Sequence, residues 1–223
     1  EGKRFGAAAD TVGELVFTTA MTGDIETLTD PSYYGQIVLQ TFPLIGNVGI
    51  IPADFESEAP SLRGYIVRDW CQAPSNFRCA GELDTFLKEH GIPGLYGIDT
   101  RALTRLVREA GVMNAAISAS PRLPEEQAAA LAGYRVENAV ASVSRPGITA
   151  VSPKGGARFR VVLWDFGAKE NIRRELLKRG CEVLTMPASS TAEQIASLKP
   201  DGIMLSNGPG DPADNQGIIE QLA

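Results

Sequence analysis

The sequence predicts a two-domain α/β protein whose second domain is a parallel, doubly wound sheet. Strand-like and helix-like segments alternate along most of the 223 residues. A stretch over 141–158 carries Ser, Pro and Gly without periodicity, which is typical of a linker. After it, the order strand, helix, strand, helix, strand indicates a parallel sheet with crossover helices. We therefore expect a first domain over 1–140, a linker over 141–158 and a second domain over 159–223.

In the first domain, strands are expected where β-branched residues concentrate, and helices where their ends are marked. One helix should end before Gly91, and another should be capped by Asp99 or Thr100 and ended by Gly111. The second of these helices places apolar residues on one face and arginines on the other, which favours a solvated basic face over a partner-binding surface. The expected strands are Glu14–Thr18, Gln36–Thr41 and Gly64–Arg68, the helices are Glu82–His90 and Thr100–Ala110, the apolar face is Leu103, Leu106, Val107 and Ala110, and the arginines are Arg101, Arg105 and Arg108.

The second domain has clearer boundaries. Ser190 followed by Glu193 is a capping-box spacing that predicts a helix start, and Gly180 should end the preceding helix. Three strands are too few to close the core of such a sheet, so we expect more sheet after Ala223, and sequence before Glu1 as well. The expected elements are strand Phe159–Trp164, helix Asn171–Arg179, strand Glu182–Met186, helix Thr191–Leu198 and strand Gly202–Leu205.

Composition and charge exclude several classes of function. The net charge of −6 provides no basic surface for nucleic acid. No segment approaches the roughly 20 apolar residues that span a bilayer, and no leader opens the chain, so no membrane contact and a cytoplasmic location are expected. Three cysteines argue against a disulfide framework, and with one histidine they cannot supply the usual metal ligands. We expect no metal site and no catalytic thiol among Cys71, Cys79 and Cys181, and a surface position for His90 near a helix end.

The segment 206–212, Ser-Asn-Gly-Pro-Gly-Asp-Pro, follows the last expected strand and is the main candidate for chemistry. Ligands of open α/β sheets bind where strands end, and glycines let backbone N–H groups approach a ligand closely. The spacing does not match a phosphate-binding loop, and Asp211 would oppose a phosphate. A plain structural turn remains the alternative. Asp165 and Lys169 end the first strand of the same domain, where they could act as site residues, pair together or cap the next helix.

Several strings together resemble one family, the glutamine-hydrolysing small chains of carbamoyl-phosphate synthase. The 206–212 segment alone indicates only a class I amidotransferase, whereas the strings of the first domain are specific to the small chain. The resemblance covers nearly the whole chain and is carried by Phe17-Thr18-Thr19-Ala20-Met21-Thr22-Gly23, Leu28-Thr29-Asp30-Pro31-Ser32-Tyr33, Gly35-Gln36-Ile37-Val38, Gly46-Asn47-Val48-Gly49, Ser75-Asn76-Phe77-Arg78, 98–105, 165–169 and 206–212.

The resemblance implies an N-terminal α/β domain followed by the first half of a flavodoxin-like class I amidotransferase domain. The family hydrolyses L-glutamine to glutamate and ammonia. The ammonia passes to a large chain that makes carbamoyl phosphate, for arginine and pyrimidine synthesis, with ATP and Mg. No cofactor is expected in this chain itself.

Within the family, the catalytic residues are a Cys-His-Glu triad, with the cysteine in a G-x-C-x-G turn. None of the triad falls within residues 1–223, so we expect all three beyond Ala223 and an inactive fragment. By resemblance, Ser32, Gly208 and Gly210 contact glutamine, and the Gly208 N–H helps to form the oxyanion hole. Two alternatives remain: a module that binds the large chain without hydrolysing glutamine, or another class I amidotransferase, such as one serving anthranilate or GMP synthesis.

Overall fold

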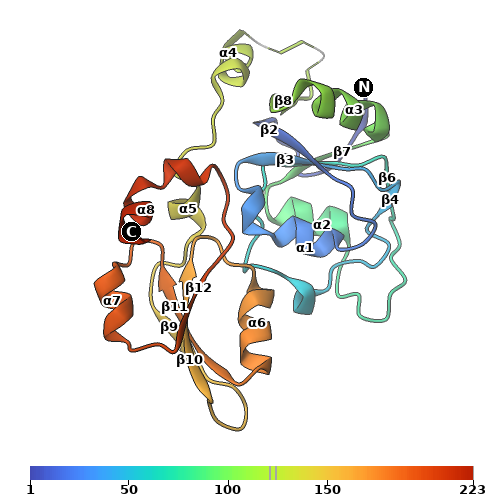
Figure 1. Ribbon diagram of the computed structural model, residues 1–223. Helices are drawn as coiled ribbons and strands as arrows, with labels where there is room; N and C mark the ends of the chain where they lie inside the picture. Colours follow the sequence, from blue (N-terminus) through green and yellow to red (C-terminus); the bar gives the residue numbers. More distant parts are fainter. Residues whose placement is uncertain (121, 124, 223) are drawn as a thin grey trace. The chain divides into compact units, whose positions relative to one another are not determined.

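The chain folds into two compact units, Glu1–Val136 and Glu137–Ala223, in the computed structural model (Figure 1). The structure describes residues 1–120, 122–123 and 125–222. The boundary between the units falls before residue 140, the expected end of the first domain. The segment 141–158 was expected to be an irregular linker, and this is wrong. It contains the end of α5 (Ala139–Val143) and all of β9 (Thr149–Val151). Elements this short leave no periodicity in the sequence.

The first unit is built on a six-stranded sheet in the order β1-β7-β5-β3-β2-β8. The four inner strands are parallel, and the two edge strands, β1 and β8, run antiparallel to their neighbours. This arrangement confirms the predicted α/β class. The strands are β1 (Lys3–Gly6), β2 (Thr11–Thr18), β3 (Gln36–Gln40), β5 (Gly64–Ile66), β7 (Pro93–Tyr96) and β8 (Met113–Ile117).

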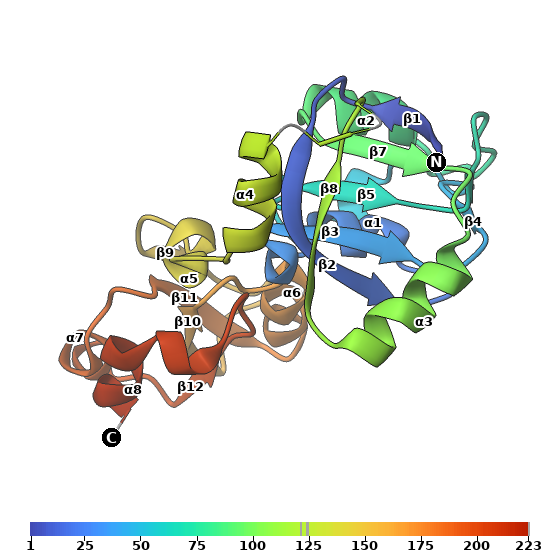
Figure 2. The ribbon, with the colours of Figure 1, turned by 90° about the horizontal axis from the view of Figure 1, so that it is seen from above.

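Helices cover both faces of this sheet because successive strand residues point to opposite sides. Val38 of β3 packs with Leu28 of α1 (Asp24–Thr29) and with Leu87 of α2 (Leu83–Glu89). Its neighbours in β3 pack on the other face against Val107 of α3 (Thr100–Ala110). Figure 1 shows α1 and α2 below the sheet and α3 above it, and Figure 2 views the strands from above. The small elements of the unit are β4 (Leu44–Ile45), β6 (Asp69–Trp70), η1 (Pro31–Tyr33), η2 (Pro52–Asp54) and α4 (Glu125–Gly133).

The expected helix over 100–110 is confirmed, with one correction to its apolar face. Asp99 is the N-cap and accepts a hydrogen bond from the Ala102 N–H at 3.0 Å, and Gly111 follows with a φ of +81°. Leu106, 49% exposed, and Ala110 are both exposed, however, because the helix lies over the sheet on a narrow stripe centred on Val107.

The second unit contains a four-stranded sheet in the order β12-β10-β11-β9. Strand β10 (Phe159–Asp165) lies between β11 (Cys181–Pro187) and β12 (Gly202–Leu205), parallel to both. Leu163 of β10 packs on α6 (Glu170–Lys178), whereas Trp164 faces α7 (Ala192–Ser197) on the opposite side. The predicted doubly wound arrangement is therefore confirmed, and β9 adds an antiparallel edge strand to it.

The predicted capping box of α7 is shifted by one residue. Thr191, not Ser190, is the N-cap, and its hydroxyl accepts from the Gln194 N–H at 3.2 Å. Gln194 Oε1 in turn accepts from the Thr191 N–H at 2.9 Å. The sequence carries two overlapping capping patterns here, and the structure uses the second, while the Ser190 N–H closes a turn onto the Pro187 carbonyl.

One edge of this second sheet is apolar. The end strand β12 exposes Ile203 by 54%, Met204 by 39% and Leu205 by 45%. An edge strand of this kind presents unpaired backbone groups and apolar side chains to which another strand can add.

Asp84 provides a test of how α2 is attached to the first sheet. Its Oδ1 accepts from the Gly6 N–H of β1 at 2.7 Å, and it pairs with Lys88. Burial raises the pKa of the Asp84 carboxyl, but the bonds from Lys88 and the Gly6 N–H outweigh it and hold the pKa below 3.8. This carboxylate therefore stabilises the fold above pH 3.8, and the contribution is lost as pH falls through its lowered folded-state pKa.

We expect Asp84→Ala to lower the free energy of unfolding by about 1 kcal/mol at pH 7, because the Gly6 N–H loses its acceptor. The difference from the unsubstituted protein should shrink at pH 3. Lys88→Ala removes only a surface pair and should cost less than about 0.5 kcal/mol. Urea unfolding of the three proteins at both pH values measures this, and equal losses for the two variants would contradict it.

Candidate functional site

Two loops lie at the carboxyl ends of neighbouring strands in the second unit. One loop, 165–169, follows β10, and the other, 206–210, follows β12. Trp164 pairs with Leu205 in register, and the Ser206 N–H donates to the Trp164 carbonyl at 3.1 Å. The helices that follow the two strands, α6 and α8 (Gln216–Leu222), pack on opposite faces of the sheet. The strand order thus reverses between β10 and β12, and open α/β sheets bind ligands at such a point.

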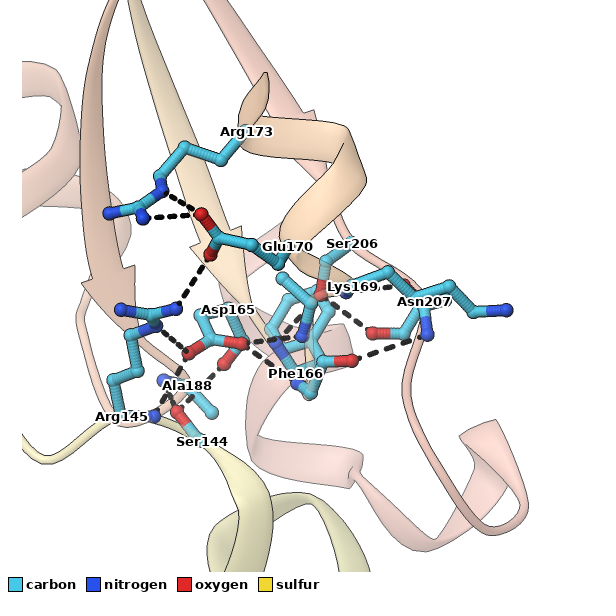
Figure 3. A network of polar contacts seen from close by, with 12 residues as sticks. Ser144, Arg145, Asp165, Phe166, Lys169, Glu170, Arg173, Ala188, Ser206 and Asn207 are labelled. Carbon is cyan, nitrogen blue, oxygen red and sulfur yellow. Dashed lines mark hydrogen bonds and ion pairs between the residues drawn. The ribbon is translucent and has the colours of Figure 1, made fainter. Parts of the chain in front are cut away.

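Asp165 organises the first loop from the end of β10. Its side chain is 2% exposed, and its Oδ1 accepts from the Gly167 and Ala168 N–H groups at 2.9 and 2.7 Å. Its Oδ2 accepts from the Arg145 N–H at 2.9 Å and lies 3.9 Å from the Arg145 Nε. Figure 3 shows these contacts. The carboxylate therefore holds the turn that precedes α6. It does not cap the helix, since the N-cap is Lys169 and no side chain caps there.

The charges around Asp165 are balanced by neighbouring side chains. Glu170, at the start of α6, accepts from Arg145 Nη2 at 3.1 Å and from Arg173 Nε at 2.9 Å (Figure 3). The Ser144 hydroxyl donates to the Asp165 carbonyl at 2.7 Å and accepts from the Ala188 N–H at 2.8 Å. This network gives the loop a rigid base, and its polar groups bind one another.

The second loop is joined to the first by two side chains. Ser206 Oγ accepts from the Phe166 N–H at 2.9 Å and donates to the Asn207 carbonyl at 2.6 Å. Asn207 Oδ1 accepts from the Lys169 N–H at 3.2 Å, and Asn207 Nδ2 donates to the Gly167 carbonyl at 3.2 Å (Figure 3). Side-chain bonds to backbone groups thus set the spacing of the two loops.

Gly208 is in close contact with the first loop. A Cβ at this position would lie 2.3 Å from the Phe166 carbonyl oxygen, so only glycine fits. Across the part of the chain that the structure describes, no residue accepts a hydrogen bond from the Gly208 N–H. The residue is exposed, and two positions later Gly210 has a φ of +78°. The backbone therefore offers an exposed donor on a restrained loop.

A cavity of about 250 Å³ borders this loop. Gly208, Gly210 and Phe166 line one side, and α8 contributes apolar side chains, including Ile218 and Ile219. Asp211 accepts from the Ala213 N–H at 2.9 Å and so caps η3 (Pro212–Asp214). The cavity is thus mainly apolar, with backbone polar groups at one wall.

The first unit has a larger cavity of about 430 Å³ at the carboxyl ends of β2 and β3, lined in part by Asp24, Glu26 and Arg78. We place the candidate site at the smaller cavity, because its wall contains both glycines that the sequence singled out.

The other candidates lie elsewhere. Ser32 belongs to the first unit, in η1, where its N–H donates to Asp30 Oδ1 at 2.9 Å, and its contact with glutamine stays a prediction. His90 ends α2, with its Nδ1 2.8 Å from the Phe86 carbonyl. Cys181 pairs with Phe159 at the amino end of β10, away from the loops. Among the described residues, no three His, Cys, Asp or Glu side chains form a metal-binding group, and no helix is long and apolar enough for a bilayer.

The sequence did not reveal the side-chain contacts that hold the site together. Arg145 lay in the expected linker, and nothing in the local pattern connects it to Asp165. Ser206 and Asn207 were within the motif but were given no role. Their polar side chains, directly after a strand and before a glycine, were the available signal.

The structural role of Asp165 in holding the site together can be tested. We expect Asp165→Ala to lower the free energy of unfolding of the second unit by about 3 kcal/mol, because the Gly167, Ala168 and Arg145 N–H groups lose their acceptor and Arg145 keeps only Glu170 as a partner. The control is Asp201→Ala, which removes one exposed bond to the Arg160 N–H and should cost about 1 kcal/mol. Trp164, 2% exposed, reports unfolding of this unit by its fluorescence. Similar losses in both variants would contradict a central role for Asp165.

Two family models match the chain, one within each unit. Residues 1–117 match the family model of the carbamoyl-phosphate synthase small chain, CPSase domain, and residues 162–223 match that of glutamine amidotransferase class-I. The carbamoyl phosphate synthase small chain of Fusobacterium nucleatum is 49% identical over 223 residues, which are 100% of this chain and 62% of that protein.

Two further relatives extend the comparison. The small chain of Bacillus caldolyticus is 49% identical over 99% of this chain and 60% of its own length. The pyrimidine-specific small chain of Bacillus subtilis is 48% identical over 100% of this chain and 60% of its own length. The chain therefore spans about 60% of the length of these relatives. With a small-chain family model matching more than half of its residues, the chain belongs to the family of carbamoyl-phosphate synthase small chains.

Proposed function

We propose that the whole protein is the glutaminase subunit of carbamoyl-phosphate synthase. It hydrolyses L-glutamine to glutamate and ammonia, and it delivers the ammonia to a large chain that makes carbamoyl phosphate for arginine and pyrimidine synthesis. The order of the two family matches along the chain supports this assignment. So do the names of relatives that are 48–49% identical.

The Gly208 N–H at the β10–β12 switch point is the observation that carries the proposal. Attack on the glutamine amide places negative charge on its oxygen, and an N–H aimed at that oxygen stabilises the tetrahedral intermediate. Because the amide itself is neutral, the nearby Asp211 does not oppose its binding. The cavity beside the loop is lined mainly by apolar side chains, which supports the proposal because a hydrogen bond to a developing charge is stronger where less water competes.

The nucleophile of the proposed reaction lies outside residues 1–223. By the resemblance, a cysteine attacks the amide carbon, ammonia leaves, and water hydrolyses the thioester. The exposed apolar edge at β12 is suited to pairing with a following strand that carries this cysteine. Ser32 and Gly210 contact the bound glutamine. ATP and Mg act on the large chain, and this chain holds no cofactor and works in the cytoplasm.

The alternatives differ in what they leave unexplained. Another class I amidotransferase accounts for 162–223 but not for the small-chain match over 1–117. A module that binds the large chain without hydrolysis accounts for both matches, and glutaminase measurements separate it from the proposal.

Two proteins test where the reaction resides. We expect residues 1–223 alone to release no glutamate from glutamine above the buffer rate, because no triad member is present. The full-length protein should turn over glutamine, alone or with the large chain present. Glutamate release measured with a coupled dehydrogenase follows both. Turnover by residues 1–223, or none by the full-length protein with its large chain, would overturn the proposal.

The Gly208 donor needs a test that adds no side chain, since any Cβ meets the Phe166 carbonyl. Glycolic acid at position 208 of the full-length protein replaces the amide by an ester, which exchanges the N–H for an oxygen, adds no side chain and weakens the Asn207 carbonyl as an acceptor only modestly. We expect kcat to fall about 100-fold. The same exchange at Gly217, where the N–H lies in the first turn of α8, serves as control and should change kcat less than about twofold. An unchanged kcat for the ester at 208 would remove the oxyanion role.

A further inference from the structure

We propose that Ser206 is a positioning residue for the oxyanion hole, because its hydroxyl sets the plane of the Asn207–Gly208 peptide and so aims the Gly208 N–H. This inference rests on the proposed function and assigns to that site a residue beyond the glycines. It follows from contacts within the second unit alone.

The geometry of the peptide group makes the connection. The Asn207–Gly208 peptide is trans, and a trans peptide is planar with its C=O and N–H pointing in opposite directions. The Ser206 hydroxyl donates to the Asn207 carbonyl at 2.6 Å. Holding that oxygen on the side of Ser206 therefore directs the Gly208 N–H to the opposite side.

The Ser206 hydroxyl is itself held by the sheet. Its oxygen accepts from the Phe166 N–H at 2.9 Å, which leaves its own proton for the Asn207 carbonyl. The Ser206 N–H continues the β10–β12 ladder by donating to the Trp164 carbonyl at 3.1 Å. Figure 3 shows Ser206 between Phe166 and Asn207. The pairing of β10 with β12 thus fixes the Ser206 hydroxyl, and the hydroxyl fixes the orientation of the Asn207–Gly208 peptide.

A loop of this composition needs such a restraint. Glycine has access to a wide range of φ and ψ, so the peptide before Gly208 can rotate at low cost. Rotation would turn the Asn207 carbonyl toward the reacting centre, where its partial negative charge would repel the developing oxyanion. The contact between Gly208 and the Phe166 carbonyl restricts the Cα position but does not determine the direction of the N–H.

Ser206→Ala in the full-length protein tests the inference. We expect kcat for glutamine hydrolysis to fall at least about tenfold, part of the loss that follows removal of an oxyanion donor, with KM changed less than about threefold. Ser206→Thr keeps the hydroxyl and should recover most of kcat. Ser197→Ala is the matched control, because the Ser197 hydroxyl also donates to a backbone carbonyl, that of Gln194 at 2.7 Å, but in α7. It should leave kcat unchanged.

An aldehyde analogue of glutamine, with CHO in place of the carboxamide, distinguishes a loss of N–H orientation at Gly208 from a general loss of protein stability. Its adduct with the cysteine is tetrahedral and carries the oxygen that the hole binds. We expect Ser206→Ala to weaken binding of the analogue by the same factor as kcat/KM, while the thermal midpoint falls by only a few degrees.

The outcomes distinguish the inference from the function on which it rests. If the ester at 208 lowers kcat but Ser206→Ala does not, the positioning role is wrong and the oxyanion role of Gly208 stands. If Ser206→Ala raises KM as much as it lowers kcat, and Ser206→Thr restores neither, the role is structural and the inference is overturned. If the ester at 208 has no effect, the oxyanion assignment fails and this inference fails with it.

Discussion

The parallel pairing of β10 with β12 is the interaction on which the candidate site depends. It brings residues 165 and 206, about 40 positions apart in the sequence, together at the carboxyl ends of the two strands. From this pairing follow the contact of Gly208 with the Phe166 carbonyl and the bonds that Ser206 and Asn207 make to the first loop. Because α6 and α8 leave the two strands on opposite faces, the space beside the loops is not filled by a crossover helix.

The buried charge of Asp165 stabilises the loop that follows β10. Asp165 is almost fully buried, and it is stable there because backbone N–H groups and Arg145 compensate its charge. Its role is to shape the turn before α6, and the exposed polar group of the site is instead a backbone N–H. A backbone donor carries no rotamer entropy and no titrating charge, which suits it to stabilising charge that exists only during reaction.

Local signals predicted the elements over 159–205 well but only part of the first unit, where α1, α4, β7 and β8 were not predicted. They failed where two signals competed or where none existed. The start of α3 at Asp99 was readable from its cap, whereas the start of α7 was misplaced because Thr191 and Gln194 form a second capping pattern beside Ser190 and Glu193. Leu106 was assigned to an apolar face, but the sheet beneath α3 covers only part of that face. Strand β9 was missed, because three residues at a sheet edge form a strand only when β11 is there to pair with them.

The sequence by itself determined the α/β class, the order of the elements over 159–205, the position of Gly208 and Gly210 after a strand, and the resemblance from which the family was inferred. These properties depend on periodicity, caps and motifs, which are local along the chain. Only the tertiary structure decided that Gly208 must be glycine, that the Asp165 carboxylate has a structural role, and that Ser206 fixes the orientation of the Asn207–Gly208 peptide. Each of these depends on atoms from residues about 20 to 40 positions apart, and it is the strand register that brings such atoms together.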